Sequence, residues 1–93
     1  MTKLLALHIY NHQIFETVTK TTALACQNFM MALVAEGFDS CPMEGFDSLK
    51  LKDLLNLNKK SEINMIIGCG IRLKEGVYGD RFRIPFDEVY FQK

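Results

Sequence analysis

Net charge is the first thing that this 93-residue sequence lacks, because eleven Lys and Arg residues balance eleven Asp and Glu residues. Without an excess of either sign, no overall field draws the chain to nucleic acid or to an anionic membrane surface. A long apolar run is missing too, since the apolar segment 4–10 falls well short of the ~20 residues that span a membrane. No small-residue cleavage site follows that segment, so it makes a poor signal peptide. The composition therefore predicts no nucleic-acid partner and no membrane partner.

Metal-ligand spacing is also absent. Cys26, Cys41 and Cys69 are an odd number of thiols without a Cys-x-x-Cys pair. This pattern favours free, mostly buried thiols in a reducing cytoplasm, structural rather than catalytic. His8 and His12 stand four residues apart, so a helix would place them on one face, but no third ligand is evident. A partly exposed helix face or a linker explains the two histidines better than a metal site, and we predict no metal.

Residues 17–36 carry the clearest periodic signal in the chain. Their apolar residues recur mostly at steps of three and four, which is typical of an amphipathic helix: Ala23, Cys26, Phe29, Met30, Leu33 and Val34. The apolar surface is broad enough to predict burial on two faces. A chain in which 48% of the residues are hydrophobic has more apolar surface than so small a monomer easily hides. We therefore expect an oligomer or a partner surface. Residues 1–16 give no clear assignment.

The stretch 37–47 organises the rest of the sequence. Gly37 can end the preceding helix in the left-handed conformation, because it has no Cβ to clash. Pro42 fixes its own φ and pushes the residue before it into an extended conformation. Asp47 is well placed to cap a following helix. The sequence predicts a rigid loop here, with backbone N–H groups that need hydrogen-bond partners at Met43, Glu44 and Gly45.

A second, shorter helix is predicted to start at Asp47. Its inner face is predicted to hold Leu51, Leu54 and Leu55, and its solvent side Lys50, Lys52 and Asp53. Asn56 and Asn58 weaken the helix and are expected to end it, and a solvated turn follows at residues 59–61.

The remaining segments predict one strand and an arm. Residues 62–69 form a short β-branched run bounded by turns, which indicates a buried strand with Cys69 as a packed thiol. Residues 72–83 contain two glycines among charged residues and indicate a loop. Residues 86–91 alternate apolar and polar side chains, which predicts an extended arm or edge strand that starts after Pro85. Helices and strands together indicate an α+β chain.

The sequence Pro42-Met43-Glu44-Gly45-Phe46-Asp47 closely resembles the Pro-(Met/Ile)-Glu-Gly-Phe-Asp loop of the nitroreductase family, the FMN-dependent NAD(P)H oxidoreductases. The resemblance continues through Cys69-Gly70 and over residues 76–89. It covers residues 17–93 in order, which corresponds to the C-terminal half of such a protein. It implies the C-terminal portion of a nitroreductase-like fold, with a long central helix, a flavin loop, a short helix, a sheet strand and an extended C-terminal arm. Residues 1–16 stay unassigned, and residues 17–93 are predicted to be a partial nitroreductase-like domain.

The same resemblance implies a cofactor site. The N–H groups of Glu44 and Gly45 would hold flavin N5 and O4, while Pro42 and Met43 would line the ring. The Glu44 side chain would face the place where substrate and nicotinamide alternate. No side chain is expected to be catalytic, because the flavin does the chemistry.

A basic pair is implied at the other end of the site. Arg81 and Arg83 would bind the FMN phosphate, since guanidinium groups bind phosphate bidentately. The two arginines would point the same way only if their segment is extended, because alternate residues share a face there. The alternative is that they are a solvated charge pair. The family's N-terminal Arg/Ser-rich phosphate segment has no counterpart before Thr17, so the chain is expected to be a fragment, a truncated product or a shortened member.

Two functions follow as hypotheses. The first is an FMN-dependent oxidoreductase that transfers hydride from NAD(P)H through the flavin to a nitroaromatic, a quinone or a similar acceptor. In the family the long helix lies at a dimer interface, so the resemblance implies a homodimer. The alternative is a non-catalytic truncated half-domain that dimerises or complements a partner through residues 17–36.

Overall fold

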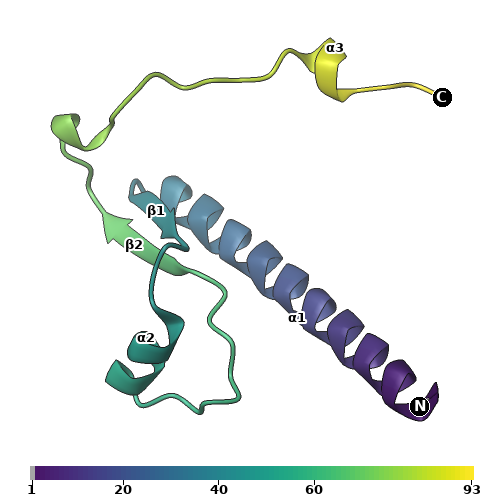
Figure 1. Ribbon diagram of the computed structural model, residues 1–93. Coiled ribbons are helices and arrows are strands. Elements are labelled where there is room, and N and C mark those ends of the chain that lie inside the picture. Colours follow the sequence, from purple (N-terminus) through teal and green to yellow (C-terminus); the bar gives the residue numbers. More distant parts are fainter. Residues whose placement is uncertain (1) are drawn as a thin grey trace.

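The computed structural model describes residues 2–93, with the side chains of residues 11–93. Its elements in chain order are α1 (Thr2–Ala35), β1 (Asp39–Met43), α2 (Ser48–Leu54), β2 (Ile66–Gly70), a 3₁₀ turn η1 (Lys74–Gly76) and α3 (Phe86–Val89). Figure 1 shows α1 as a long rod beside a two-stranded sheet, with α2 in the connection between the strands. This is the α+β arrangement of a long helix, a sheet, a short helix and an arm that the sequence predicts.

Helix α1 begins at Thr2, well before the expected start at Thr17. The reason is that residues 1–36 contain neither Gly nor Pro, so nothing interrupts helical hydrogen bonding. His12 lies on this helix with its Nε2 atom 3.7 Å from the Glu16 carboxylate, and both side chains are exposed. The side chain of His8 lies outside the described residues. In the described part of the chain, no three potential ligand side chains gather as a metal site would need, and no helix has the length and apolar character to cross a membrane.

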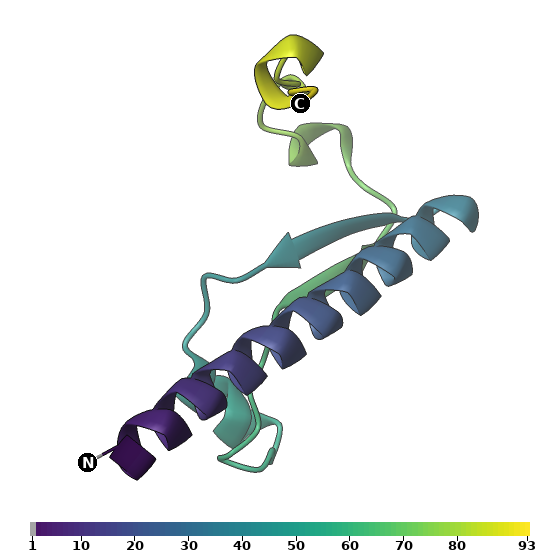
Figure 2. The same cartoon turned by 90° about the vertical axis from the view of Figure 1, so that its right-hand side faces the viewer.

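The end of α1 reverses the chain through a Schellman motif. Gly37 has φ +83°, the left-handed conformation expected of it. The Gly37 N–H donates to the Val34 carbonyl at 3.0 Å, and the Phe38 N–H donates to the Leu33 carbonyl at 2.9 Å. These two bonds satisfy carbonyl groups that the last helical turn would otherwise leave without donors. They also turn the chain back, so that β1 runs alongside the end of α1 (Figure 2).

The predicted rigid loop is in part a strand. β1 pairs antiparallel with β2, and the register sets Asp39 opposite Gly70 and Met43 opposite Ile66. Pro42 is accommodated inside β1 because an edge strand needs no N–H on its outer side. The strand predicted over residues 62–69 is shorter in the structure, because β2 begins only at Ile66. The strand prediction is therefore right in place and wrong in extent.

Helix α2 ends as predicted but turns a different face inward. Asn56 has φ +51°, and the Leu57 N–H donates to the Lys52 carbonyl at 2.9 Å, which repeats the motif at the end of α1. Lys52, predicted to face solvent, is 6% exposed, whereas Leu54 and Leu55 of the predicted inner face are 80% and 56% exposed. The Lys52 ammonium lies 3.8 Å from the Glu62 carboxylate, an ion pair that joins α2 to the segment that follows it.

The connection between α2 and β2 is tied to the long helix. The Asn64 side-chain amide donates to the Thr19 carbonyl on α1 at 2.9 Å. Before it, Asn58 accepts from the Lys60 N–H at 2.9 Å through its side chain, which closes the predicted turn at residues 59–61. One hydrogen bond therefore holds this loop against the middle of α1.

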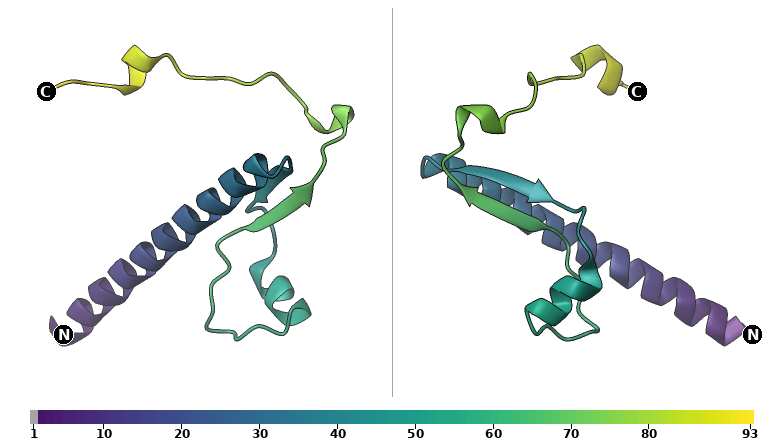
Figure 3. Two further views of the ribbon diagram at one scale, coloured as in Figure 1. Left: turned by 180° about the vertical axis from the view of Figure 1, so that it is seen from behind. Right: turned by 60° about the vertical axis from the view of Figure 1, so that its left-hand side comes forward.

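The C-terminal arm, residues 77–93, extends away from the helix and sheet in every view (Figures 1 and 3). The prediction of an extended segment over residues 86–91 is wrong for its first part, because Phe86–Val89 form one helical turn instead of an edge strand. Pro85 starts that turn, and the rings of Phe86 and Tyr90 stack with their centroids 4.8 Å apart. Stacking of residues four apart favours a helical turn over a strand, which would place them farther apart.

The chain does not close around a core. The radius of gyration of its Cα atoms is 18.3 Å, against about 12 Å expected for a compact chain of this length. Its accessible surface is 9043 Å², against roughly 5500 Å² for a folded monomer of this mass. Among residues 11–93, no hydrophobic side chain is buried and Lys52 is the one buried residue. Many large hydrophobic side chains of these residues are exposed instead.

We expect Gly37→Ala to lower the free energy of unfolding by about 1 kcal/mol, because a Cβ is strained at positive φ. Urea unfolding of the chain, followed by far-ultraviolet circular dichroism, measures this loss. Gly79→Ala is the matched control, since φ there is not positive and no atom would meet the new methyl group. Equal effects of the two substitutions would refute the role assigned to Gly37.

Candidate functional site

The candidate loop consists of residues 44–47, between the end of β1 and the start of α2. The Phe46 N–H donates to the Glu44 carbonyl at 3.0 Å, which makes a tight bend. Within the described structure, no hydrogen bond engages the N–H groups of Glu44 and Gly45, and both residues are exposed. The loop therefore presents two adjacent backbone donors that are free to bind an acceptor.

Both ends of this loop are fixed. On one side, Met43 is held by its pairing with Ile66. On the other, the Asp47 carboxylate caps α2 by accepting from the N–H groups of Leu49 at 3.1 Å and Lys50 at 3.2 Å. The predicted cap is confirmed, and it satisfies donors that the first helical turn leaves open. The two free donors thus sit on a short segment between a strand and a capped helix.

The predicted phosphate pair lies elsewhere. Arg81 and Arg83 are exposed residues of the arm, and the Arg83 guanidinium donates to the Phe82 carbonyl at 3.0 Å. In Figure 1 the arm runs far from the β1–α2 connection. The structure therefore brings Pro42, Met43, Glu44 and Gly45 together and leaves the two arginines apart from them.

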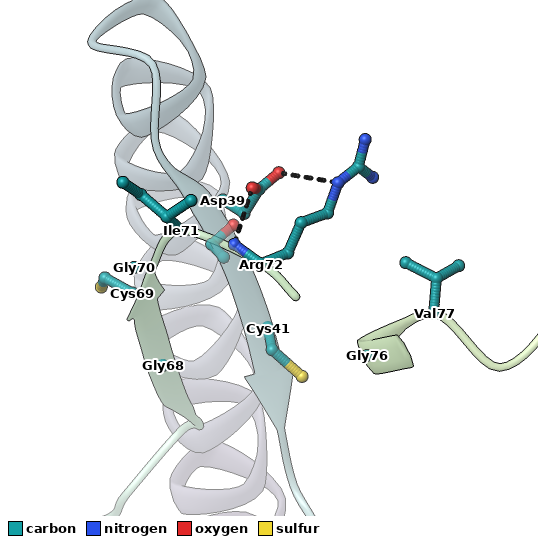
Figure 4. Close-up of a pocket in the computed structure, with 10 residues that line it drawn as sticks. Asp39, Cys41, Gly68, Cys69, Gly70, Ile71, Arg72, Gly76 and Val77 are labelled. Carbon is teal, nitrogen blue, oxygen red and sulfur yellow. Dashed lines mark hydrogen bonds and ion pairs between the residues drawn. The ribbon is translucent and has the colours of Figure 1, made fainter. Parts of the chain in front are cut away.

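Another group of residues lines a hollow beside the sheet that the sequence did not reveal (Figure 4). Asp39 accepts from the Arg72 N–H at 3.2 Å, and its other oxygen lies 3.9 Å from Arg72 Nε. A Cβ on Gly70 of β2 would meet no atom within 4 Å, so the hollow is open there, and Gly68 and Val77 also line it. Asp39 and Arg72 meet only because Asp39 pairs with Gly70, so no spacing in the sequence indicates the contact.

The thiols are less buried than predicted. Cys41 and Cys69 are exposed, and Cys26 is half-buried. Cys41 is opposite Gly68 and Cys69 is opposite Ser40, so the two thiols belong to opposite faces of the sheet, as Figure 4 shows. They cannot form a disulfide within this sheet. The prediction of buried thiols is wrong for Cys41 and Cys69, because no described part of this chain covers the sheet at these residues.

The long helix, the returning strand with its capped loop, and the second strand define an α+β unit. The model of the nitroreductase family matches residues 3–71, and the chain belongs to that family. No curated protein matches the chain significantly.

A solved structure shares the fold. The crystal structure of ydfN from Bacillus subtilis, described provisionally as a nitroreductase, superposes on this chain with a TM-score of 0.69 at 32% sequence identity. The match covers 76% of this chain and 34% of ydfN, so the chain spans about a third of that protein's length. The likeness confirms the nitroreductase-like fold, and it also shows how much of that fold lies beyond this chain.

We expect Asp47→Ala to destabilise α2 by about 1 kcal/mol, because two N–H groups lose their acceptor. Urea unfolding measures the loss. Asp47→Asn should retain most of the stability, since an asparagine side chain also caps helices. If Asp47→Asn cost as much as Asp47→Ala, the carboxylate charge rather than the cap would be responsible.

Proposed function

We propose that the chain is part of an FMN-dependent oxidoreductase and that residues 42–45 hold the reactive edge of the flavin. The observation that supports this most is the pair of free N–H donors at Glu44 and Gly45, held between paired β1 and capped α2. Donors on such a segment can orient a flavin without introducing a reactive side chain. Membership of the nitroreductase family supports an oxidoreductase role in general terms.

The roles of the loop residues follow from their atoms. The Glu44 and Gly45 N–H groups would donate to flavin N5 and O4, and Pro42 and Met43 would contact the ring. When bound, the flavin supplies hydride transfer from NAD(P)H to a nitroaromatic, quinone or similar acceptor. The exposed Glu44 side chain would border the space that nicotinamide and acceptor occupy in turn. We place this chemistry in the cytoplasm.

The phosphate would be bound by Arg81 and Arg83. Their exposure leaves both guanidinium groups available for an anion. In the extended arrangement of the chain the arm is remote from the loop, so the arm must take another position for both segments to contact one cofactor. The proposed site is thus divided between two separate segments.

We expect the purified chain to bind FMN more weakly than a full-length relative does. Arg83→Ala should weaken binding further, by about 1.5–3 kcal/mol, because a charged hydrogen bond to phosphate is lost. The effect should be larger at low salt, where screening is least. Glu44→Ala should reduce turnover more than affinity, because the backbone N–H remains. Flavin absorbance titration and steady-state reduction assays measure these quantities.

Lys59→Ala is the control for the loss of one positive charge, since Lys59 lies in the exposed turn after α2. Absence of binding at millimolar FMN by the folded chain would refute the flavin proposal. If Arg83→Ala and Lys59→Ala weakened FMN binding equally, the assignment of Arg83 to the phosphate would be refuted instead.

The alternative function is a non-catalytic half-domain that dimerises or complements a partner through α1. The supporting observation is that residues 21–35 contain no charged side chain although they lie on a helix that this chain leaves largely uncovered. Leu24, Phe29 and Met31 are 68%, 47% and 59% exposed. An uncharged helical stretch with several exposed large apolar side chains is normally buried against other protein.

We expect the chain to self-associate as a homodimer, and Leu24→Glu to shift it towards monomer, because a charge would be buried at the interface. Sedimentation velocity over a dilution series measures the dissociation constant. Leu73→Glu, at a similarly exposed position outside α1, is the control. A well-folded monomer at all concentrations would contradict the expectation.

A further inference from the structure

The two outer edges of the sheet differ in their capacity to accept another strand. In an antiparallel pair, opposite residues alternate between pairs whose backbone groups bond across the ladder and pairs whose groups point outward. The register of β1 and β2 gives five opposite residue pairs. Once one pair is known to be hydrogen-bonded or outward-pointing, the alternation assigns the other four.

Cys41 and Gly68 supply that reference. A Cβ built on Gly68 would lie 3.9 Å from the Cys41 carbonyl oxygen. This short distance requires the carbonyl to point across to β2, so Cys41 and Gly68 bond to each other. By alternation, Ser40 with Cys69 and Pro42 with Ile67 are the two outward-pointing pairs. Pro42 fits this assignment, because the N–H that it lacks would have pointed away from β2.

The consequence is an asymmetry between the edges. The outer edge of β1 offers the N–H of Ser40 alone, because Pro42 has none. The outer edge of β2 offers the N–H groups of both Ile67 and Cys69 and no proline. The described sheet has two strands, so no third strand pairs with these N–H groups, and the Ile67 carbonyl receives the weak Cys69 thiol at 3.6 Å. A proline is a recognised means of closing a sheet edge, and the edge of β2 has no such protection.

We propose that the sheet continues from β2, whose outer edge pairs with an extended strand of a nitroreductase-type polypeptide, from the part of the fold that this chain does not span. The inference rests on family membership and on the edge geometry, not on flavin binding, so the two proposals can fail independently. The occupant would hydrogen-bond to Ile67 and Cys69 and leave the edge of β1 unpaired.

Two observations favour this occupant over a second copy. About two thirds of ydfN lie outside the match, and the family model matches residues 3–71 of this chain, which contain the sheet. The accessible surface also exceeds that of a compact chain by roughly 3500 Å², which is more than a standard interface covers on one partner. A second copy paired through β2 alone would cover only the sheet edge, whereas the missing part of the fold can cover the edge, the open sheet face and α1 together.

The test uses this chain co-expressed with the part of ydfN outside the match. Amide hydrogen exchange should slow by about tenfold or more at Ile67 and Cys69 in the complex and stay unchanged at Ser40. Cys69→Pro removes an outward N–H from β2, and it should weaken co-purification by about tenfold. Ser40→Pro removes the outward N–H directly opposite and should have no effect. Cys69→Ala keeps the N–H and should bind as the unaltered chain does, which separates loss of the donor from loss of the thiol.

Several outcomes would overturn the proposal. Slowed exchange at Ser40 instead of Ile67 and Cys69 would place the new strand on β1. Equal effects of the two proline substitutions would remove the asymmetry. Slowed exchange at Ile67 and Cys69 in the chain alone, rising with its own concentration, would identify a second copy as the occupant. Unchanged exchange and no co-purification would leave the edge of β2 without the proposed partner.

Discussion

The reversal of the chain at Gly37 is the constraint on which the rest of the structure depends. One residue at positive φ lets β1 return along the end of α1, and β2 can pair only after β1 has been placed there. The loop with the free donors then follows directly from the strand, and Asp47 fixes its far end. An ordinary residue in place of Gly37 would strain the turn that sets the direction of every later element.

The parts of the fold that depend on local chemistry were predictable from the sequence. The helix stop at Gly37, the cap at Asp47 and the stop at Asn56 each need only one residue type in one conformation. Burial was not predictable in the same way. The pattern of leucines and cysteines was interpreted as an inner face, but Leu54 and Cys69 are exposed, because no described part of this chain covers them. A hydrophobic pattern indicates that a surface is covered without indicating what covers it.

The candidate site was predictable to a similar degree. Residues 42–45 are consecutive, so local geometry keeps them together, and the structure adds only that the last part of the stretch follows a paired strand. Arg81 and Arg83 stand on an arm that extends away from the helix and the sheet, so no local rule could place them beside the loop. Asp39 and Arg72 were missed for the same reason, since only the strand register brings them within 3.9 Å.

The connection between the strands also bears on how the sheet assembles. β1 and β2 are not a hairpin, because residues 44–65 separate Met43 from Ile66 and must close into a loop before any ladder bond forms. The entropic cost of closure grows by only about 0.6 kcal/mol for each doubling of a flexible loop's length. Within this loop, α2 with its cap and the turn at Asn58 are local structures that can form first. Early order in α2 would shorten the flexible part of the loop, so the order of folding that the chain favours is helices before sheet.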